Sequence, residues 1–281
     1  MSQAKEKRPD SSRSVNNDYD KAKQYWTHQS PMQPELMGVS DIGGCGITEV
    51  LYRHFEEVRH LRRLIVFNHH KTILELGSGN GRWAIALAPL VKQYIAVDFS
   101  QQMLDIALSR AKHFKLHNIS FHCSDVQDFT PQIPLDIVYL SGVSQYLQDI
   151  DMKTLLMRLK KFLCPDAVII DRSTIHLRQR LFSERPDYFC IYRTAEELTQ
   201  LYYEAGFTLR YQRPSYHFLN TPGIIRSFFC TRHVTSMIKL TSPLSFHFLR
   251  ALAWTCAHTW GPTGEVLDFS HDFFIFNRST A

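Results

Sequence analysis

Three glycines at alternate positions, Gly77, Gly79 and Gly81, could bring backbone N–H groups close to a bound ligand. They follow the apolar run 72–76 and open a segment with helical periodicity, which predicts a strand, a loop and a helix. Glycine lacks the Cβ atom that would block a close approach, and the start of a helix directs free N–H groups at a ligand. Because Arg82 follows the third glycine, the G-x-G-x-x-G dinucleotide pattern is not met.

Carboxylates end the next two predicted strands. Asp98 closes the run 94–98, where its two oxygens can accept hydrogen bonds from both hydroxyls of a ribose. Asp125, followed by Val126, comes after the run 119–123 and could meet the edge of an adenine. Asp125 is also suited to begin a helix, so a capping role is the alternative. Together with the glycine loop, these residues predict a site for an adenosine-containing ligand.

The elements that would position these residues alternate between short apolar runs and longer periodic stretches, which is typical of a doubly wound α/β sheet. Strands are predicted over 72–76, 94–98, 119–123, 135–140, 167–171, 207–213 and 272–276. Helices are predicted over 81–90, 101–115, 151–162 and 194–205. Two segments stand outside this alternation: a helical N-terminal extension over 18–70, and an insertion over 214–268 before the last strand.

Composition narrows the range of partners and ligands that the sequence predicts. A net charge of +5, from 32 basic and 27 acidic residues, and the absence of a basic stripe do not favour nucleic acid as a partner. The six cysteines are far apart and have no zinc-binding spacing, so no metal site is predicted and a cytoplasmic location is expected. Residues 1–17 are predicted to be a disordered polar tail, and 18–281 a single domain without a membrane-spanning helix.

The pattern over residues 71–213, together with the final strand, resembles the class I S-adenosylmethionine-dependent methyltransferases. The resemblance implies a seven-stranded Rossmann-like sheet whose last strand is antiparallel, and S-adenosylmethionine as the cofactor. It also implies a cofactor site that extends beyond the loop and the two aspartates. The further residues are Glu75, Phe99, Met103 and Ser141.

Residues 19–26, Tyr-Asp-Lys-Ala-Lys-Gln-Tyr-Trp, resemble the opening motif of the protein alpha-N-terminal methyltransferases. The segments 79–82 and 127–131 agree with the same subfamily. The resemblance implies that Arg82 meets the methionine carboxylate of the cofactor. It further implies that Tyr25 and Trp26 form a lid over the cofactor, although Trp26 could instead only anchor a helix to the core.

The residues expected to bind the methyl acceptor differ from those of that subfamily. Its Gln-Trp pair after the fourth strand is replaced by Ser141-Gly142, and its His in the peptide pocket by Tyr146. Its Asp-Asn pair after the fifth strand is replaced by Arg172-Ser173. The charged pocket for a peptide amine is therefore not reproduced, and the sequence predicts a shared cofactor half with a different substrate half.

If the acceptor carries a proton, a base within hydrogen-bond reach is needed, and the candidates are Tyr146, His176 and His217. Each could equally be a packing or surface residue. Residues 224–260 interleave aromatic and basic side chains. This segment could cap the active site, dock on a membrane surface, contact a second copy of the chain, or simply pack as extra helices.

The leading hypothesis is a methyltransferase that acts on a small, apolar or aromatic metabolite at N, O or C. One alternative is alpha-amino methylation of a protein N-terminus, which the motif at 19–26 suggests. The other is an inactive protein that binds S-adenosylmethionine and acts as a scaffold or activator. These three hypotheses differ in the methyl acceptor, which the sequence alone does not identify.

Overall fold

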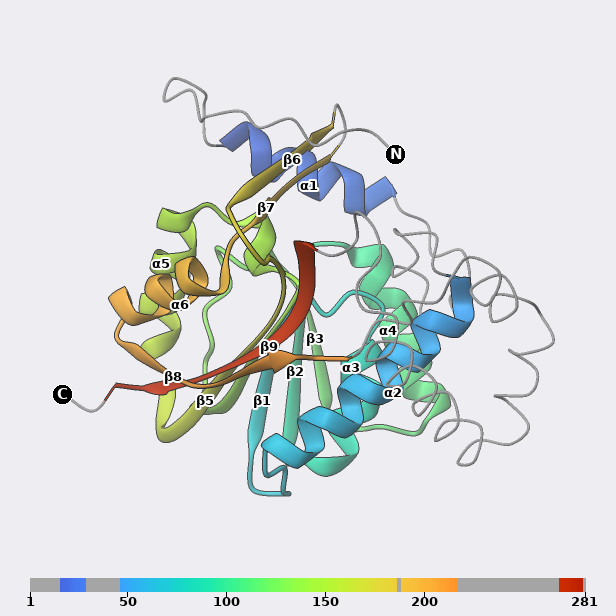
Figure 1. The fold of residues 1–281 in the computed structure, drawn as a ribbon. Helices are drawn as coiled ribbons and strands as arrows, with labels where there is room; N and C mark the ends of the chain where they lie inside the picture. Colours follow the sequence, from blue (N-terminus) through green and yellow to red (C-terminus); the bar gives the residue numbers. More distant parts are fainter. Residues whose placement is uncertain (1–15, 29–45, 186–187, 217–267, 280–281) are drawn as a thin grey trace, which may run out of the picture. The chain divides into compact units, whose positions relative to one another are not determined.

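The structure of the protein, a computed structural model, describes residues 16–28, 46–185, 188–216 and 268–279 (Figure 1). The chain divides into two compact units, of which the larger contains residues 1–30, 67–213 and 269–281. The smaller contains 31–66 and 214–268. The two units are described separately below, and the single domain expected over 18–281 stays a prediction.

The larger unit is built on a seven-stranded sheet with the order β3-β2-β1-β4-β5-β9-β8. Strands β1 to β5 pair in parallel, and β9 pairs antiparallel with β5. This is the predicted sheet with its antiparallel last strand. The bounds are β1 Thr72–Leu76, β2 Gln93–Asp98, β3 Ile119–Cys123, β4 Leu135–Ser141, β5 Leu163–His176, β8 Phe207–Pro214 and β9 Phe269–Arg278.

Helices cover both faces of this sheet (Figure 1). Helices α3 (Arg82–Leu87) and α4 (Gln101–His113) contact each other, as do α5 (Asp149–Lys160) and α6 (Ala195–Glu204). All five residues of β1 are buried, as expected for a central parallel strand. The direction of winding reverses between β1 and β4, and ligands of such sheets bind at the carboxyl ends of the strands on either side of that point.

The strands after β4 differ from the prediction. Strand β5 runs over Leu163–His176 rather than 167–171, because β9 pairs with it as far as His176 and Phe269. A hairpin of β6 (Leu181–Arg185) and β7 (Tyr188–Tyr192) follows and forms a second sheet, which the sequence had not predicted.

The N-terminal extension is helical over α1 (Asn16–His28) and α2 (Gly46–Leu64), and residues 29–45 lie outside the described part. Helix α1 belongs to the larger unit and contacts β7 (Figure 1). Helix α2 belongs to the smaller unit, where Ser215 donates a 3.0 Å hydrogen bond to the Glu57 carboxylate. Most of the insertion over 214–268 lies outside the described residues. No helix within the described ranges is long and apolar enough to cross a membrane.

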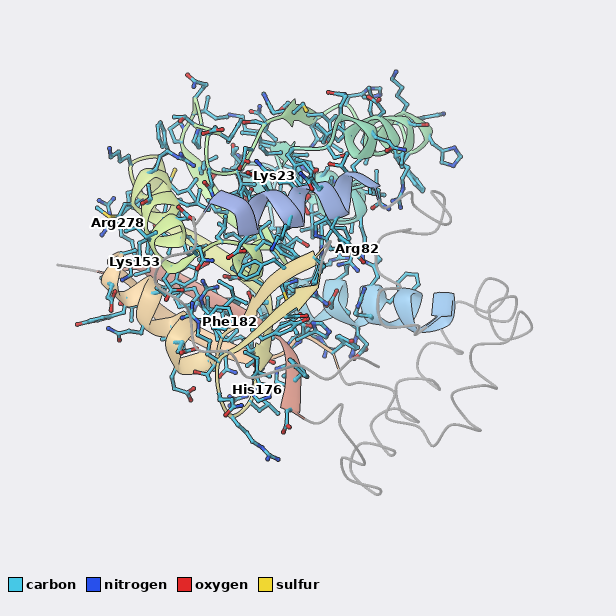
Figure 2. All side chains as sticks on the ribbon, turned by 90° about the horizontal axis from the view of Figure 1, so that it is seen from above. Lys23, Arg82, Lys153, His176, Phe182 and Arg278 are labelled. Carbon is cyan, nitrogen blue, oxygen red and sulfur yellow. The ribbon has the colours of Figure 1, made fainter. Side chains whose placement is uncertain are left out.

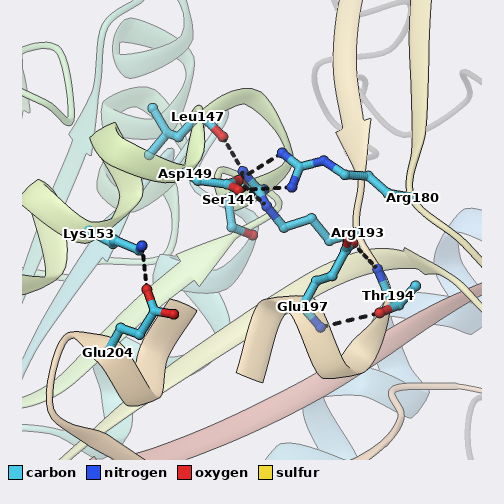
Figure 3. Close-up of polar contacts among 9 residues, drawn as sticks. All are labelled: Ser144, Leu147, Asp149, Lys153, Arg180, Arg193, Thr194, Glu197 and Glu204. Atoms are coloured by element: carbon cyan, nitrogen blue, oxygen red, sulfur yellow. Dashed lines mark hydrogen bonds and ion pairs between the residues drawn. The ribbon is translucent and has the colours of Figure 1, made fainter. Parts of the chain in front are cut away.

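Asp149, at the start of α5, joins both ends of the β6–β7 hairpin (Figure 3). Arg180, just before β6, donates two 2.8 Å hydrogen bonds to its carboxylate. Arg193, just after β7, donates two more, at 3.0 and 2.7 Å. Burial alone would raise the pKa of Asp149, but the hydrogen bonds and charges of the two arginines outweigh it and lower the pKa to about 2. The carboxylate therefore stays ionised and holds the base of the hairpin.

Arg193 also fixes the short 3-10 turn η4 (Ser144–Tyr146) that follows β4. Its guanidinium is buried and donates to the carbonyl oxygens of Ser144, at 2.7 Å, and Leu147, at 2.6 Å. The Ser144 hydroxyl donates to the buried carboxylate of Asp171 at 2.9 Å. The carbonyls on either side of Tyr146 are thus tied to the same arginine that ends the hairpin.

Replacing Asp149 with Asn removes the charge that both arginines share and should lower the free energy of unfolding by about 1–2 kcal/mol, since the carboxylate is partly exposed. Because folding lowers the pKa of Asp149, its contribution is present above the unfolded pKa near 3.8 and is lost as the pH falls towards 2. Urea titration of both proteins at pH 7 and pH 3 measures this difference. A matched control is Glu204→Gln, which breaks the exposed Lys153–Glu204 ion pair (Figure 3) and should have a much smaller effect. Equal effects of the two substitutions would contradict the role given to Asp149.

Candidate functional site

The glycine loop lies between β1 and α3, and its three glycines all have positive φ: 72° at Gly77, 51° at Gly79 and 76° at Gly81. A Cβ at Gly77 would lie 2.3 Å from Val143 Cγ2, and one at Gly81 would lie 2.8 Å from Ala107 Cβ. A Cβ at Gly79 would meet no atom within 4 Å. Gly77 and Gly81 are therefore required by the packing of the loop, whereas Gly79 borders open space.

Asp98, at the end of β2, is buried directly beside this loop. One carboxylate oxygen accepts a 2.8 Å hydrogen bond from the Gly79 N–H, and the other accepts a 2.9 Å bond from the Ser100 N–H. Burial raises the pKa of Asp98, while these two backbone hydrogen bonds lower it. Each oxygen retains a second lone pair, so the carboxylate can still accept from the hydroxyls of a ligand.

Polar atoms without partners gather along the same loop. The Tyr94 hydroxyl donates a 2.9 Å hydrogen bond to Glu75 Oε2, but Oε1 of this buried carboxyl has no partner among the described residues. Burial raises the pKa of Glu75 to about 8. Ser78 Oγ and Asn80 Nδ2 are also buried without a hydrogen bond in the described part of the chain. Since buried polar groups are nearly always paired, these atoms fit a polar ligand on the loop.

Other residues of the predicted cofactor site lie on the elements around the loop. Arg82 begins α3, with its guanidinium 5.2 Å from the centre of the Trp83 ring. Met103 is buried on α4, after Phe99 and the Ser100 cap. Ser141 ends β4, opposite Arg172 of β5.

Asp125 connects the loop after β3 with α1, whose Lys23 is labelled in Figure 2. The Tyr19 hydroxyl donates to Asp125 Oδ1 at 2.8 Å, and Lys23 Nζ donates to Oδ2 at 3.2 Å. The Gln127 N–H also donates to Oδ1, at 2.9 Å, within a turn that contains the buried Val126. Asp125, which the sequence predicts at the edge of the adenine, is thus also the residue that binds Tyr19 and Lys23 of α1.

Four aromatic rings meet where α1 lies on β7. The Tyr25 ring is 5.2 Å from that of Trp26 and 4.8 Å from that of Tyr188. The Tyr146 ring is 6.0 Å from that of Trp26 and 6.1 Å from that of Tyr188. These rings form a closed set of neighbours, called the ring circuit below, with Tyr25 and Trp26 from α1, Tyr146 from η4 and Tyr188 from β7.

The three predicted base candidates have different surroundings. Burial raises the pKa of the Tyr146 hydroxyl well above its ordinary value, so this group stays neutral and cannot act as a phenolate base near pH 7. His176 Nδ1 accepts hydrogen bonds from the backbone N–H groups of Arg178, at 3.3 Å, and Gln179, at 3.0 Å. With Nδ1 as the acceptor, a neutral His176 ring carries its proton on Nε2, so Nε2 is a hydrogen-bond donor. His217 lies outside the described residues.

Several residues of this region were not singled out from the sequence. They are Gln145, Asp149, Arg180, Tyr188 and Arg193. A usable signal was present in the run 188–192, where apolar and aromatic residues follow a Pro-Asp pair, as in a strand after a turn. Nothing in the sequence indicated that two arginines thirteen residues apart would share one carboxylate.

Comparison with known proteins agrees with this geometry. The family described as "Methyltransferase domain" matches residues 73–166. A phosphoethanolamine N-methyltransferase from Triticum aestivum is 30% identical over 113 residues, which are 38% of this chain and 22% of the relative. The match thus spans only about a fifth of that relative's length.

Solved structures share the fold. A phosphoethanolamine N-methyltransferase of Haemonchus contortus has a TM-score of 0.64 at 13% identity, covering 96% of this chain and 50% of that chain. A SAM-dependent methyltransferase of Leishmania major has a TM-score of 0.58 at 16% identity, covering 73% of this chain and 79% of that chain. Residues 73–166 thus match a methyltransferase domain, and the seven-stranded sheet found above is the Rossmann-like fold of these solved neighbours.

Proposed function

We propose that the protein uses S-adenosylmethionine to methylate a small molecule at N, O or C. The observation that carries this proposal is the glycine loop itself. Its central residue, Gly79, borders open space while its N–H is bonded to Asp98, and unpaired polar atoms of Glu75, Ser78 and Asn80 lie along it. A polar ligand that carries a ribose and an ammonium group would pair these atoms.

The cofactor would be held by groups from several elements around the glycine loop. Asp98 would accept from the ribose hydroxyls, and Glu75 lies close enough to the loop to attract the methionine ammonium. Arg82 would face the methionine carboxylate. Phe99, Met103 and Val126 would surround the adenine, with Asp125 at its edge. Ser141, at the carboxyl end of β4, would lie on the side of the acceptor.

Bound in this way, the cofactor supplies a methyl group on a positively charged sulfur, which is a good leaving group. The protein then has to align the acceptor atom with that methyl group and exclude water. The turn that follows β4 and carries Tyr146 packs against the glycine loop through Val143. The ring circuit therefore lies on the acceptor side of the loop, with Tyr25 and Trp26 as lid residues from α1.

The names of the relatives favour a small-molecule acceptor, since several refer to phosphoethanolamine. Methylation of a protein N-terminus is the competing function. A purified protein that binds S-adenosylmethionine but forms no S-adenosylhomocysteine with metabolite extracts or peptides would instead be a scaffold. Profiling of extracts with isotopically labelled methyl donor separates these three outcomes.

Replacing Gly79 with Ala tests the cofactor site. A methyl group there strikes no protein atom, and φ of 51° costs the folded state only about 1 kcal/mol, so the variant should fold. It should nevertheless bind S-adenosylhomocysteine at least about tenfold more weakly, because the added atom occupies the open side of the loop. Isothermal titration calorimetry measures the affinity.

A matched control is Asp105→Asn, on the exposed face of α4, which should leave the affinity unchanged. Asp98→Asn, which keeps the shape but removes the charge, should weaken binding as Gly79→Ala does. Wild-type affinity in both loop variants would show that the cofactor does not bind there.

Cofactor binding should also release a proton near pH 7. The pKa of about 8 keeps the Glu75 carboxyl protonated in the free protein, and an adjacent ammonium group favours its ionised form. Calorimetry in buffers of different ionisation enthalpy should therefore detect the release of up to about one proton per site at pH 7. The release should disappear in Glu75→Gln and at pH 9.5, where Glu75 is already ionised. Identical proton release by the wild type and Glu75→Gln would refute this assignment.

A further inference from the structure

The turn after β3 is held in place by an arginine of helix α5. Arg158 Nη2 donates a 2.7 Å hydrogen bond to the carbonyl oxygen of Val126, and Nη1 donates to the carbonyl oxygen of Gln127. One planar guanidinium thus binds two successive carbonyls of the turn. Because the N–H groups of arginine form a rigid fork, this pair of hydrogen bonds fixes the direction of both carbonyls.

The same turn holds the carboxylate of Asp125. The Gln127 N–H donates to Asp125 Oδ1 at 2.9 Å, and this N–H belongs to the peptide group whose carbonyl is that of Val126. A peptide group is planar and trans, so its N–H and its C=O point to opposite sides. Arg158 and the Asp125 carboxylate therefore hold one peptide plane from its two sides. Without Arg158, that plane would be free to rotate away from the carboxylate.

One lone pair of the Asp125 carboxylate is left for a ligand. Each carboxylate oxygen has two lone pairs. Oδ1 accepts from the Gln127 N–H and, at 2.8 Å, from the Tyr19 hydroxyl, so both of its lone pairs are in use. Among the described residues, Oδ2 accepts from Lys23 alone, at 3.2 Å. An amino group that approaches the turn can therefore donate to Oδ2.

The next residue in the chain supplies a hydrogen-bond donor. Val126 is buried, and its N–H forms no hydrogen bond with an acceptor in the described part of the chain. An acceptor and a donor on adjacent residues match the edge of adenine, whose 6-amino group donates and whose N1 accepts. The base hypoxanthine has the opposite pattern, with an acceptor at position 6 and an N–H at N1.

Attachment of α5 to the core does not explain Arg158. The helix already has four buried apolar residues, which are Met152, Leu155, Leu156 and Leu159. The Arg158 Nε is buried and has no hydrogen-bond partner among the described residues. An unpaired buried donor is costly, and an apolar side chain would avoid that cost. The hydrogen bonds to the turn are what an arginine adds at this position.

We propose that Arg158 is a positioning residue that makes the cofactor site specific for adenine: by holding the turn after β3, it directs the open lone pair of Asp125 Oδ2 at the 6-amino group of the base. This inference rests on the proposed cofactor site and goes beyond it. Arg158 acts through the backbone of the turn, not by contact with the cofactor. Specificity for the base thus depends on a side chain from α5.

The test compares two ligands that differ only in the base: S-adenosylhomocysteine and its analogue with hypoxanthine in place of adenine. Isothermal titration calorimetry of the full chain measures both affinities. The wild type should bind S-adenosylhomocysteine at least about tenfold more tightly, because the analogue directs a carbonyl oxygen at Asp125. The ratio of the two affinities is the decisive quantity. Partial unfolding of a variant lowers both affinities equally and leaves their ratio unchanged.

Three variants locate the origin of this preference. Arg158→Met should reduce the ratio to less than about threefold. Arg158→Lys keeps the charge but replaces the planar fork by one nitrogen, so its ratio should lie between those of Arg158→Met and the wild type. Asp125→Asn should also lose most of the preference, because an amide can either accept or donate. A matched control is Lys153→Met, which removes a cation of α5 that binds Glu204 and should keep the wild-type ratio.

A wild-type ratio in both Arg158 variants or in Asp125→Asn would overturn the proposal, as would the absence of a preference in the wild type. If Arg158→Met does not fold, Arg158→Lys decides alone. Failure of the proposed function gives a different result: the wild type would then bind neither ligand. If the wild type binds S-adenosylhomocysteine and the Arg158 variants keep its ratio, the cofactor site stands and only the role of Arg158 is wrong.

Discussion

The close passage of the glycine loop between its neighbours is the constraint on which both halves of the site depend. A Cβ at Gly77 would meet Val143, and one at Gly81 would meet Ala107 of α4. Val143 directly precedes the η4 turn that carries Tyr146. The glycine loop and the η4 turn therefore pack together through one methyl group of Val143, and a shift of the loop would move the turn that carries Tyr146. Positive φ at both glycines makes this passage possible.

The hairpin β6–β7 constrains the position of the η4 turn, as the glycine loop does through Val143. Its ends are joined through Asp149, and Arg193 extends the same network to the carbonyls that flank Tyr146. The ions in this cluster hold the backbone, whereas the side chains that face α1 are neutral aromatic rings. The charged groups of this cluster thus fix the backbone, and the rings of the circuit pack on α1.

Helix α1 connects the two halves. Tyr19 and Lys23 donate to Asp125, the residue expected at the adenine edge. Tyr25 and Trp26, within one turn after Lys23, join the ring circuit. A ligand on either side therefore acts on the same helix. Binding of cofactor and of acceptor would be coupled through the position of α1, since each contributes contacts that favour the docked helix.

The sequence by itself determined the sheet and the place of the glycine loop and the two aspartates at its edge. Apolar runs ending in Gly77–Gly81, Asp98 and Asp125 are local patterns, and parallel strands bring their carboxyl ends to one edge whatever the rest of the chain does. The β6–β7 hairpin, the shared Asp149 and the ring circuit depended on the tertiary structure. Tyr25 and Tyr188 are 163 residues apart, and Arg180, Arg193 and Asp149 meet only because the hairpin folds back on the turn after β4. Contacts of that range have no periodicity along the chain, so packing decided them.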